Sequence, residues 1–278
     1  MSNMRFLYII LILMILLSGC IEQSNISDNI LIDIDYEKNV ISGFDLPIKV
    51  YITNNFKKDI KNVKIYFDNL GILNFKNIEE CRGSKIDKGC VFQNIYSGEA
   101  EKVVFLVNIP ESSYISGSKI KAQISISYDS EDQKVISIPI LGNEYKEIKT
   151  LSEYSTGGPV NVNVKISSND NAKSFVRSGD IIFLEVDISS NSENVVIKKD
   201  DFSISLIGFS VYGDNKNCDF EGYNVLKPKN DIYLPLDSHL TCIIKAKNLN
   251  DETSWFDGKI IVDYYYNFKI TKNVIINI

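Results

Sequence analysis

One short run of residues contains the three side-chain types of a serine hydrolase. Asp237, Ser238 and His239 are consecutive, and His239 is the only histidine among the 278 residues. Neighbouring residues of a strand point to opposite faces, so three in a row cannot assemble a catalytic triad. We therefore expect His239 to be a surface residue that leads into the strand of Cys242. We assign no catalytic residue, and we expect no enzyme activity.

Adjacent carboxylates could in principle act as an acid and a base. They occur at Glu79–Glu80, Glu131–Asp132 and Asp200–Asp201. A glycosidase needs two carboxyl groups about 5–10 Å apart across a cleft, which adjacency in the sequence does not provide. Because Asp and Glu are rarely buried, we expect all three pairs to lie on the surface in turns.

Oxygen-rich segments offer the ligands that calcium prefers. The two candidates are residues 167–171 (Ser-Ser-Asn-Asp-Asn) and 214–219 (Asp-Asn-Lys-Asn-Cys-Asp). Neither has the ligand spacing of an EF-hand loop. Asn and Asp are also ordinary turn residues. The sequence thus predicts no metal and no cofactor, with calcium as the alternative.

Four cysteines follow Cys20, and four thiols allow three pairings. We favour the sequential one, Cys81–Cys90 with Cys218–Cys242, because it keeps each bridge inside one expected domain. A zinc site is the alternative, but the chain has no Cys-x-x-Cys and a single histidine. An even set of thiols suits an exported protein in an oxidising exterior.

Two aromatic clusters could form a sugar-binding platform or pack in a core. Alternation along Tyr264, Tyr265 and Tyr266 would bury the first and third residues and leave Tyr265 outward. Trp255 precedes Gly258, which we expect to form a turn, with the indole closing the end of a sandwich. We favour packing over binding, since aromatic side chains bury large areas in such interiors.

The first 29 residues do not read as part of a fold. Arg5 precedes twelve apolar residues, Phe6–Leu17, and Ser18, Gly19 and Cys20 follow. This run is shorter than the ~20 residues of a membrane-spanning helix and is typical of an export signal. We expect residues 1–19 to be a signal peptide and residues 20–29 a polar tether. Asn25 begins the Asn-Ile-Ser sequon, a candidate glycosylation site.

The segment Leu17-Ser18-Gly19-Cys20 resembles the lipobox of prokaryotic lipoproteins. The resemblance implies cleavage before Cys20 and a lipid, palmitate or an archaeal lipid, on its thiol. It places the protein at the cell membrane, lipid-anchored on the extracytoplasmic face. The partner at this point of the chain would be the membrane itself.

Alternation of apolar and polar residues is the strongest pattern in the chain. It runs through Ile120–Tyr128, Val160–Ile166, Ile182–Ile188 and Ile260–Phe268. Such alternation indicates antiparallel sheets with one face on a core and the other in water. No helical stripe of comparable length occurs, so the predicted fold class is all-β.

The two halves of the chain correspond to one another. Cys81 corresponds to Cys218, and Ile120–Tyr128 corresponds to Ile260–Phe268. A closing strand, Val135–Ile140 or Val274–Ile278, ends each half. Short strands separated by turn residues are typical of β-sandwiches. We therefore expect two tandem sandwich domains, residues 30–142 and 159–278, joined by a linker over residues 143–158.

The first of these domains carries a further resemblance. A strand ends in Thr53-Asn54-Asn55, and Ser97–Glu101 later leads into the strand Val103–Val107. This order resembles the immunoglobulin-like, CARDB-like domains of archaeal and bacterial surface proteins, and we favour an archaeal lipoprotein. The resemblance implies an adhesion, binding or spacer module without catalytic residues.

Composition narrows the function classes. The net charge is −6, with 30 basic and 36 acidic residues, which argues against a nucleic-acid partner. At 44% hydrophobic residues the chain is not a polytopic membrane protein. We expect a non-enzymatic lipoprotein that presents two β-sandwich domains for adhesion, scaffolding or interaction with a surface protein or glycan. The alternative is a solute- or carbohydrate-binding lipoprotein of a transporter or envelope complex.

Overall fold

The computed structural model describes residues 30–278 except 112–116, 148, 169–170, 191–194, 214–217, 235 and 237–238. Cys20, Asn25 and the expected signal and tether lie outside the described residues. Within the described part the only helical element is the 3-10 turn η1 (Lys199–Asp201). No described helix has the length and apolar character needed to cross a membrane. The fold is all-β with antiparallel sheets, as the alternation predicts.

The strands fall into an earlier and a later set along the chain. The earlier strands are β1 (Ile30–Asp35), β2 (Asp45–Asn54), β3 (Ile60–Asn69), β4 (Asn74–Cys81), β5 (Ser84–Ile86), β6 (Gly89–Ile95), β7 (Ala100–Asn108) and β8 (Lys119–Leu141). The later strands are β9 (Ser152–Ser155), β10 (Val160–Ser168), β11 (Asn171–Ala172), β12 (Val176–Arg177), β13 (Ile181–Ser190), β14 (Val196–Ile197), β15 (Phe202–Ile207), β16 (Phe209–Val211), β17 (Phe220–Glu221), β18 (Val225–Pro228), β19 (Ile232–Tyr233), β20 (His239–Ala246) and β21 (Trp255–Asn277).

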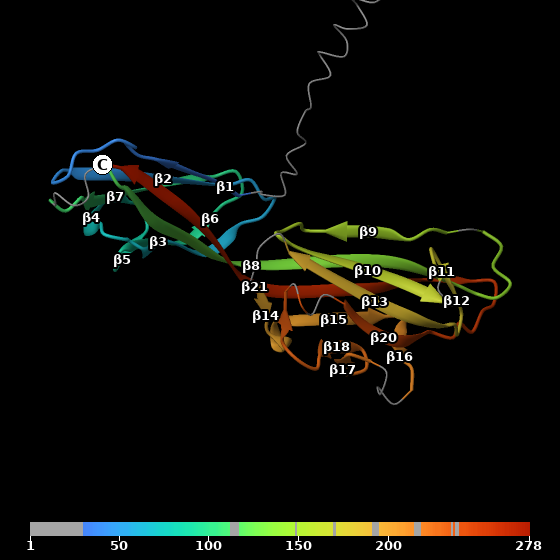
Figure 1. Cartoon of the computed structure of the whole chain (residues 1–278). Coiled ribbons are helices and arrows are strands. Elements are labelled where there is room, and N and C mark those ends of the chain that lie inside the picture. The colour runs from blue at the N-terminus through green and yellow to red at the C-terminus, as the bar shows by residue number, and fades with distance from the viewer. Residues whose placement is uncertain are drawn as a thin grey trace, which may run out of the picture.

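Three main sheets contain most of these strands. A four-stranded sheet has the order β1-β2-β7-β4, and a five-stranded sheet has the order β11-β10-β13-β20-β16. The large sheet has the order β17-β18-β15-β21-β8-β3-β6-β5, with β9 and β12 also paired to β8. The two smaller sheets each face a different part of the large one (Figure 1).

The centre of the large sheet is one long antiparallel ladder. β8 and β21 each have 23 residues and pair from Leu141 opposite Trp255 to Lys119 opposite Asn277. Figure 1 shows this pair running through both halves of the molecule. The expected closing strand Val135–Ile140 is therefore the continuation of β8, and Val274–Ile278 continues β21. The prediction of separate closing strands was wrong. Residues 269–277 of β21 pair with residues 119–127 of β8, so the end of the later half belongs to the sheet of the earlier half. The expected domain boundaries do not include this pairing.

Most even-numbered residues of the ladder face the interior. On β8 these are Ile120–Ile126 at one end and Ile136–Ile140 at the other, with even-numbered side chains at most 3% exposed. Across the first interior, the rings of Phe67 on β3 and Phe105 on β7 lie 5.1 Å apart, edge to face. Burial of each such large apolar side chain stabilises the fold by roughly 1.5–3 kcal/mol. The ladder thus supplies apolar side chains to two packed regions, one around Ile120–Ile126 and one around Ile136–Ile140.

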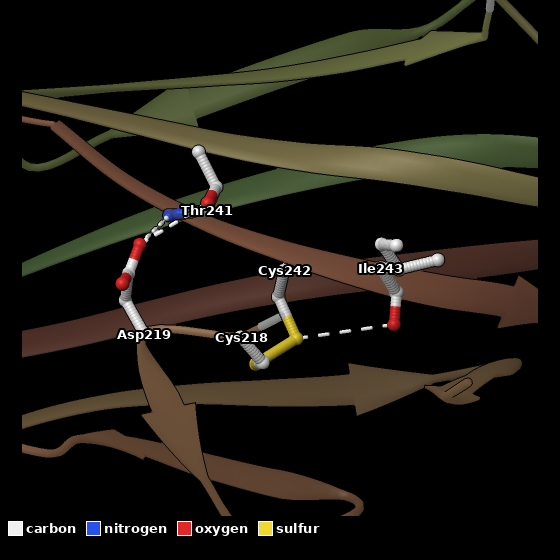
Figure 2. The surroundings of a disulfide bond; sticks show 5 residues. All are labelled: Cys218, Asp219, Thr241, Cys242 and Ile243. Carbon is white, nitrogen blue, oxygen red and sulfur yellow. Dashed lines mark hydrogen bonds between the residues drawn. A yellow bond between two sulfur atoms is a disulfide. The ribbon is translucent and has the colours of Figure 1, made fainter. Parts of the chain in front are cut away.

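A disulfide joins facing sheets in each half. Cys81 on β4 is bonded to Cys90 on β6, and Cys218, just before β17, is bonded to Cys242 on β20. These are the sequential pairs that the sequence analysis favoured. Figure 2 shows Cys218 and Cys242 bridging from the segment before β17 to β20. The loss of chain entropy on closing loops of this length is worth about 3 kcal/mol per bridge.

Candidate functional site

A polar cluster interrupts the apolar interior in the middle of β8. Ser130 is 2% exposed and Asp132 is 1% exposed, although both lie between the two apolar stretches of the strand. Lys58, Thr156 and Tyr266 complete the group. We call Lys58, Ser130, Asp132, Thr156 and Tyr266 the junction cluster, because they join segments from both halves.

The loop between β2 and β3 delivers Lys58 to this cluster. Asn54, the last residue of β2, is fully buried, and its Nδ2 donates hydrogen bonds to the carbonyl oxygens of Lys58 and Ile95, each at 2.9 Å. Its Oδ1 accepts from the amide of Phe56 at 3.0 Å, as an Asx turn does. Asn54 therefore holds the loop in a conformation in which the Lys58 side chain reaches β8.

All four partners of the cluster converge on the Asp132 carboxylate. Asp132 Oδ1 contacts Lys58 Nζ and accepts from Thr156 Oγ1 at 2.8 Å. Asp132 Oδ2 accepts from Tyr266 Oη at 2.6 Å and from Ser130 Oγ at 3.3 Å. Lys58 Nζ also donates to Ser130 Oγ at 2.8 Å and to the Glu131 carbonyl at 3.0 Å. A buried charge is tolerated only when it is paired and hydrogen-bonded in this way.

Burial governs the protonation of the groups around Asp132. The Lys58 side chain is 17% exposed and that of Asp132 is 0% exposed. Desolvation lowers the pKa of Lys58, while the neighbouring Asp132 carboxylate acts in the opposite direction. Burial, reinforced by the charge of Asp132, raises the pKa of Tyr266. Tyr266 therefore keeps its hydroxyl proton and remains a donor to Asp132.

Gly158 closes the cluster from the segment before β10. A methyl group at this position would collide with Asp132 Oδ2 and with Tyr266 Oη. Only a residue without a side chain lets the backbone approach so closely. Thr156 and Gly158 belong to the segment expected as a linker, so its last residues help to enclose Asp132.

The structure corrects the expectation that Asp132 lies on the surface. Glu131 is exposed as expected, with 73% of its side chain accessible, whereas Asp132 is buried. The physical reason is that β8 continues without a turn, so Asp132 shares the inward face with Tyr128 and Ile136. That parity was visible in the sequence and could have identified Asp132. The pairs at Glu79–Glu80 and Asp200–Asp201 are not buried.

His239 lies on the surface at the start of β20, as expected. Its side chain is 54% exposed, and its Nδ1 lies 2.7 Å from Asp187 Oδ1. Hydrogen bonds from His239 and Lys165 lower the pKa of Asp187. Asp237 and Ser238, the other two residues of the hydrolase-like run, lie outside the described residues. The imidazole thus forms a surface pair with Asp187.

An open pocket of about 360 Å³ lies beside His239. We call it the His239 pocket, and its lining residues are Asp219, Pro228, Lys229, Asn230, Asp231, Ile232, Leu236, His239 and Leu240. The Asp219 carboxylate is already hydrogen-bonded to the Thr241 amide at 2.7 Å and to Thr241 Oγ1 at 3.1 Å (Figure 2). The pocket combines polar and apolar walls next to the Cys218–Cys242 bridge.

The calcium alternative gains no support from the described residues. Both candidate loops, residues 167–171 and 214–219, lie partly outside the described part of the chain. Within the described part, no three or more His, Cys, Asp or Glu side chains are grouped as a metal site would require. Calcium binding therefore remains an untested alternative.

The aromatic residues of β21 lie largely as expected. Tyr264 and Tyr266 are 2% and 1% exposed and stack with ring centroids 6.0 Å apart, whereas Tyr265 is 38% exposed. Trp255 differs from expectation. It is 43% exposed, and Lys149 Nζ lies 4.2 Å from its ring centroid. β21 continues through Gly258 without a turn, so the indole does not close the end of a core.

Comparisons with known proteins do not assign the chain. No family model matches it, and no curated protein matches it significantly. Similar solved structures include the secreted serine protease VesC from Vibrio cholerae, at 13% identity over 83% of this chain and 50% of that chain, with a TM-score of 0.21. Red sea bream transglutaminase shows 6% identity over 90% of this chain and 31% of that one, with a TM-score of 0.23.

A third similar structure is a Salmonella alpha-2-macroglobulin mutant, with 8% identity over 87% of this chain and 16% of that chain, at a TM-score of 0.17. The chain spans half or less of the length of each of these three structures. At such TM-scores the similarities carry no argument about fold family or function.

Proposed function

We propose that this chain is a non-enzymatic lipoprotein, anchored through Cys20 on the extracytoplasmic face of the cell membrane. It presents two tandem immunoglobulin-like domains for adhesion, scaffolding or interaction with a surface protein or glycan. The observation that carries the proposal is the pair of disulfides: Cys81–Cys90 joins β4 to β6, and Cys218–Cys242 joins the segment before β17 to β20. Bridges of this kind persist in oxidising compartments outside the cytosol.

The start of the described chain bears on how such an anchor would hold the protein. Ile30 pairs with Asn54, and Asn54 holds the loop that carries Lys58 to the junction cluster. The nine residues 21–29 of the tether have a root-mean-square reach of roughly 15–18 Å. The lipid would therefore hold the molecule near its middle, with one half on either side of the attachment point.

Membrane fractionation tests the anchor. The full chain with Cys20→Ser is expected in the soluble extracytoplasmic fraction, whereas the unmodified chain sediments with membranes and is released only by detergent. Asn25→Gln is the matched control, because it changes the same segment and leaves the thiol in place. Recovery of the unmodified chain as a wholly soluble protein that retains residues 1–19 would refute the proposal.

Binding of a solute or carbohydrate is a second candidate function. The His239 pocket favours it, because its volume of about 360 Å³ falls in the range of small-ligand sites and it mixes polar with apolar walls. Glycan-array binding that is lost in Leu240→Trp, a change that fills the pocket, is the expected result for this function. Equal binding by the variant and the unmodified chain would assign recognition to another surface.

A further inference from the structure

We propose that Lys58 and Asp132 become joined by an intramolecular amide bond between Lys58 Nζ and Asp132 Cγ. The cross-link would tie the β2–β3 loop to the middle of β8, at the point where the two packed regions meet. This inference rests on the junction cluster alone and does not depend on the lipid anchor or on the proposed function.

The first argument is the position of the two reacting groups. Lys58 Nζ contacts Asp132 Oδ1 directly, and both side chains are withdrawn from water, at 17% and 0% exposure. Nζ is held from three directions, by Asp132, by Ser130 Oγ and by the Glu131 carbonyl. Holding reactants in such a geometry can be worth effective concentrations of about 10⁵–10⁸ M.

The two carboxylate oxygens of Asp132 have different partners that suit different fates. Oδ1 accepts a hydrogen bond from Thr156 Oγ1 at 2.8 Å and would remain as the amide oxygen. Oδ2 accepts from Tyr266 Oη at 2.6 Å and from Ser130 Oγ at 3.3 Å. The Thr156 hydroxyl stabilises the charge that collects on Oδ1 when the carboxyl carbon is attacked, and the hydroxyl donors on Oδ2 assist the departure of that oxygen as water.

The step balances without any further reactant. The Lys58 ammonium has three protons, and one moves to Asp132 Oδ2, leaving a neutral amine and a carboxylic acid. The amine lone pair forms the bond from Nζ to Cγ, a second Nζ proton moves to Oδ2, and the bond from Cγ to Oδ2 breaks. Oδ2 leaves as water, and the third proton remains on the amide nitrogen, where Ser130 Oγ or the Glu131 carbonyl accepts it.

The surroundings favour the free amine that the step requires. Desolvation lowers the pKa of Lys58, which increases the fraction of free amine. The backbone of Gly158 fills the space in front of Asp132 Oδ2 and Tyr266 Oη and so restricts the entry of bulk water. Removing an ion pair from the interior also relieves the desolvation cost of two buried charges.

A neighbouring pair, Lys61 on β3 and Glu131 on β8, shows what the cluster adds. Lys61 Nζ lies 3.6 Å from Glu131 Oε2, but these side chains are 58% and 73% exposed. Water reaches both groups and competes for their contact, and neither group is held by the further partners that surround Lys58 and Asp132. Lys61 and Glu131 are therefore a matched control in which the same functional groups are expected to stay unlinked.

Mass spectrometry of the full chain, denatured and reduced, tests the bond. The expected result is a mass lower than the sequence mass by one water molecule. After digestion, trypsin does not cleave at Lys58, and a branched peptide contains Lys58 together with Asp132. A full-mass chain with cleavage after Lys58 and a linear peptide around Asp132 would overturn the proposal and leave an ion pair only.

Two variants locate the linkage. Lys58→Arg retains the charge and removes the nucleophile, so the mass deficit of one water is expected to disappear. Lys61→Arg is the matched control and should retain the full deficit. If the deficit persisted in Lys58→Arg, the water would have been lost elsewhere, and the assignment to Lys58 and Asp132 would be wrong.

Discussion

The junction cluster and the surroundings of His239 contain the same kinds of side chain in opposite environments. In the junction cluster, a lysine, three hydroxyls and one carboxylate converge, and Asp132 is 1% exposed. At the surface, His239 and Lys165 share the Asp187 carboxylate, and the side chains of His239 and Asp187 are 54% and 37% exposed. A lysine contacts an aspartate in both places, but the two contacts differ in burial and in the number of partners of the carboxylate.

The comparison teaches where the structure depends on polar contacts. The β2–β3 loop, β8, the segment before β10 and β21 all meet at the junction cluster, so its loss affects both halves. The contact between His239 and Asp187 joins two strands that are already paired, β20 and β13. We expect changes at the junction to be costly and changes at the surface pair to be small.

Asp132→Ala should have the largest effect. It leaves Lys58 buried without its counter-charge and removes the acceptor of Thr156 and Tyr266. We expect the free energy of unfolding to fall by at least 3–5 kcal/mol, measured by denaturant titration. Glu131→Ala on the same strand is the control, and it should change stability by less than about 1 kcal/mol. Similar losses in both variants would erase the distinction between the cluster and the surface.

The double change Cys218→Ser with Cys242→Ser comes next. It removes the bridge between the segment before β17 and β20, beside the His239 pocket. Chain entropy predicts a loss of about 3–3.5 kcal/mol, seen as a lower midpoint of thermal unfolding. The Cys81–Cys90 bridge closes a shorter loop, so its removal by the corresponding double change should cost slightly less stability. A larger loss for the shorter loop would contradict the chain-entropy account of these bridges.

Gly158→Ala should have an intermediate effect, because the added methyl group collides with Asp132 Oδ2 and Tyr266 Oη. Overpacking of this kind costs roughly 1–3 kcal/mol, again measured by denaturant titration. Gly157→Ala is the neighbouring control. Gly157 has open space around its Cβ position but a φ of +72°, so only the backbone penalty of about 1 kcal/mol applies. Equal losses of stability at both positions would show that the close approach of Gly158 to Asp132 and Tyr266 has no energetic importance.

The smallest effect concerns pH and Asp187. Its lowered pKa means that its contribution to stability is present above the ordinary carboxyl value of 3.8 and is lost as the pH falls through the lowered folded-state value. Since the pair is solvent-exposed, we expect no more than about 0.5 kcal/mol. Unfolding of the unmodified chain and of Asp187→Asn, compared at about pH 6 and about pH 3, measures it. A difference between the two proteins that grew on acidification would contradict this sign.

Much of the fold was accessible from the sequence because alternation reports directly on which residues face a core. The strands around Ile120–Tyr128 and Ile260–Phe268, the outward Tyr265 and the sequential disulfides all follow from local patterns. The continuous course of β8 was missed, because the polar run from Asp129 to Lys134 resembles a turn. Its pairing with β21, a strand far along the chain, shows that it is strand.

The junction cluster was harder to predict, since its members come from distant segments. Asp132 could have been found from its inward parity, but nothing local shows that Lys58 in a loop and Thr156 in a linker-like segment meet there. Their convergence follows from the conformation that Asn54 imposes on one loop and from the close approach of Gly158. Such contacts are properties of the assembled fold.

The β8–β21 ladder has a consequence for how the protein is made. Residues 269–277 leave the ribosome long after residues 119–127, with which they pair in the large sheet. The half that emerges first therefore cannot finish folding until residues 269–277 have been made, and one side of the first part of β8 stays unpaired until then. Pairing across so long a stretch of chain is intrinsically slow. The nascent protein consequently passes through a state with an open β-strand edge, and such an edge can pair with other chains.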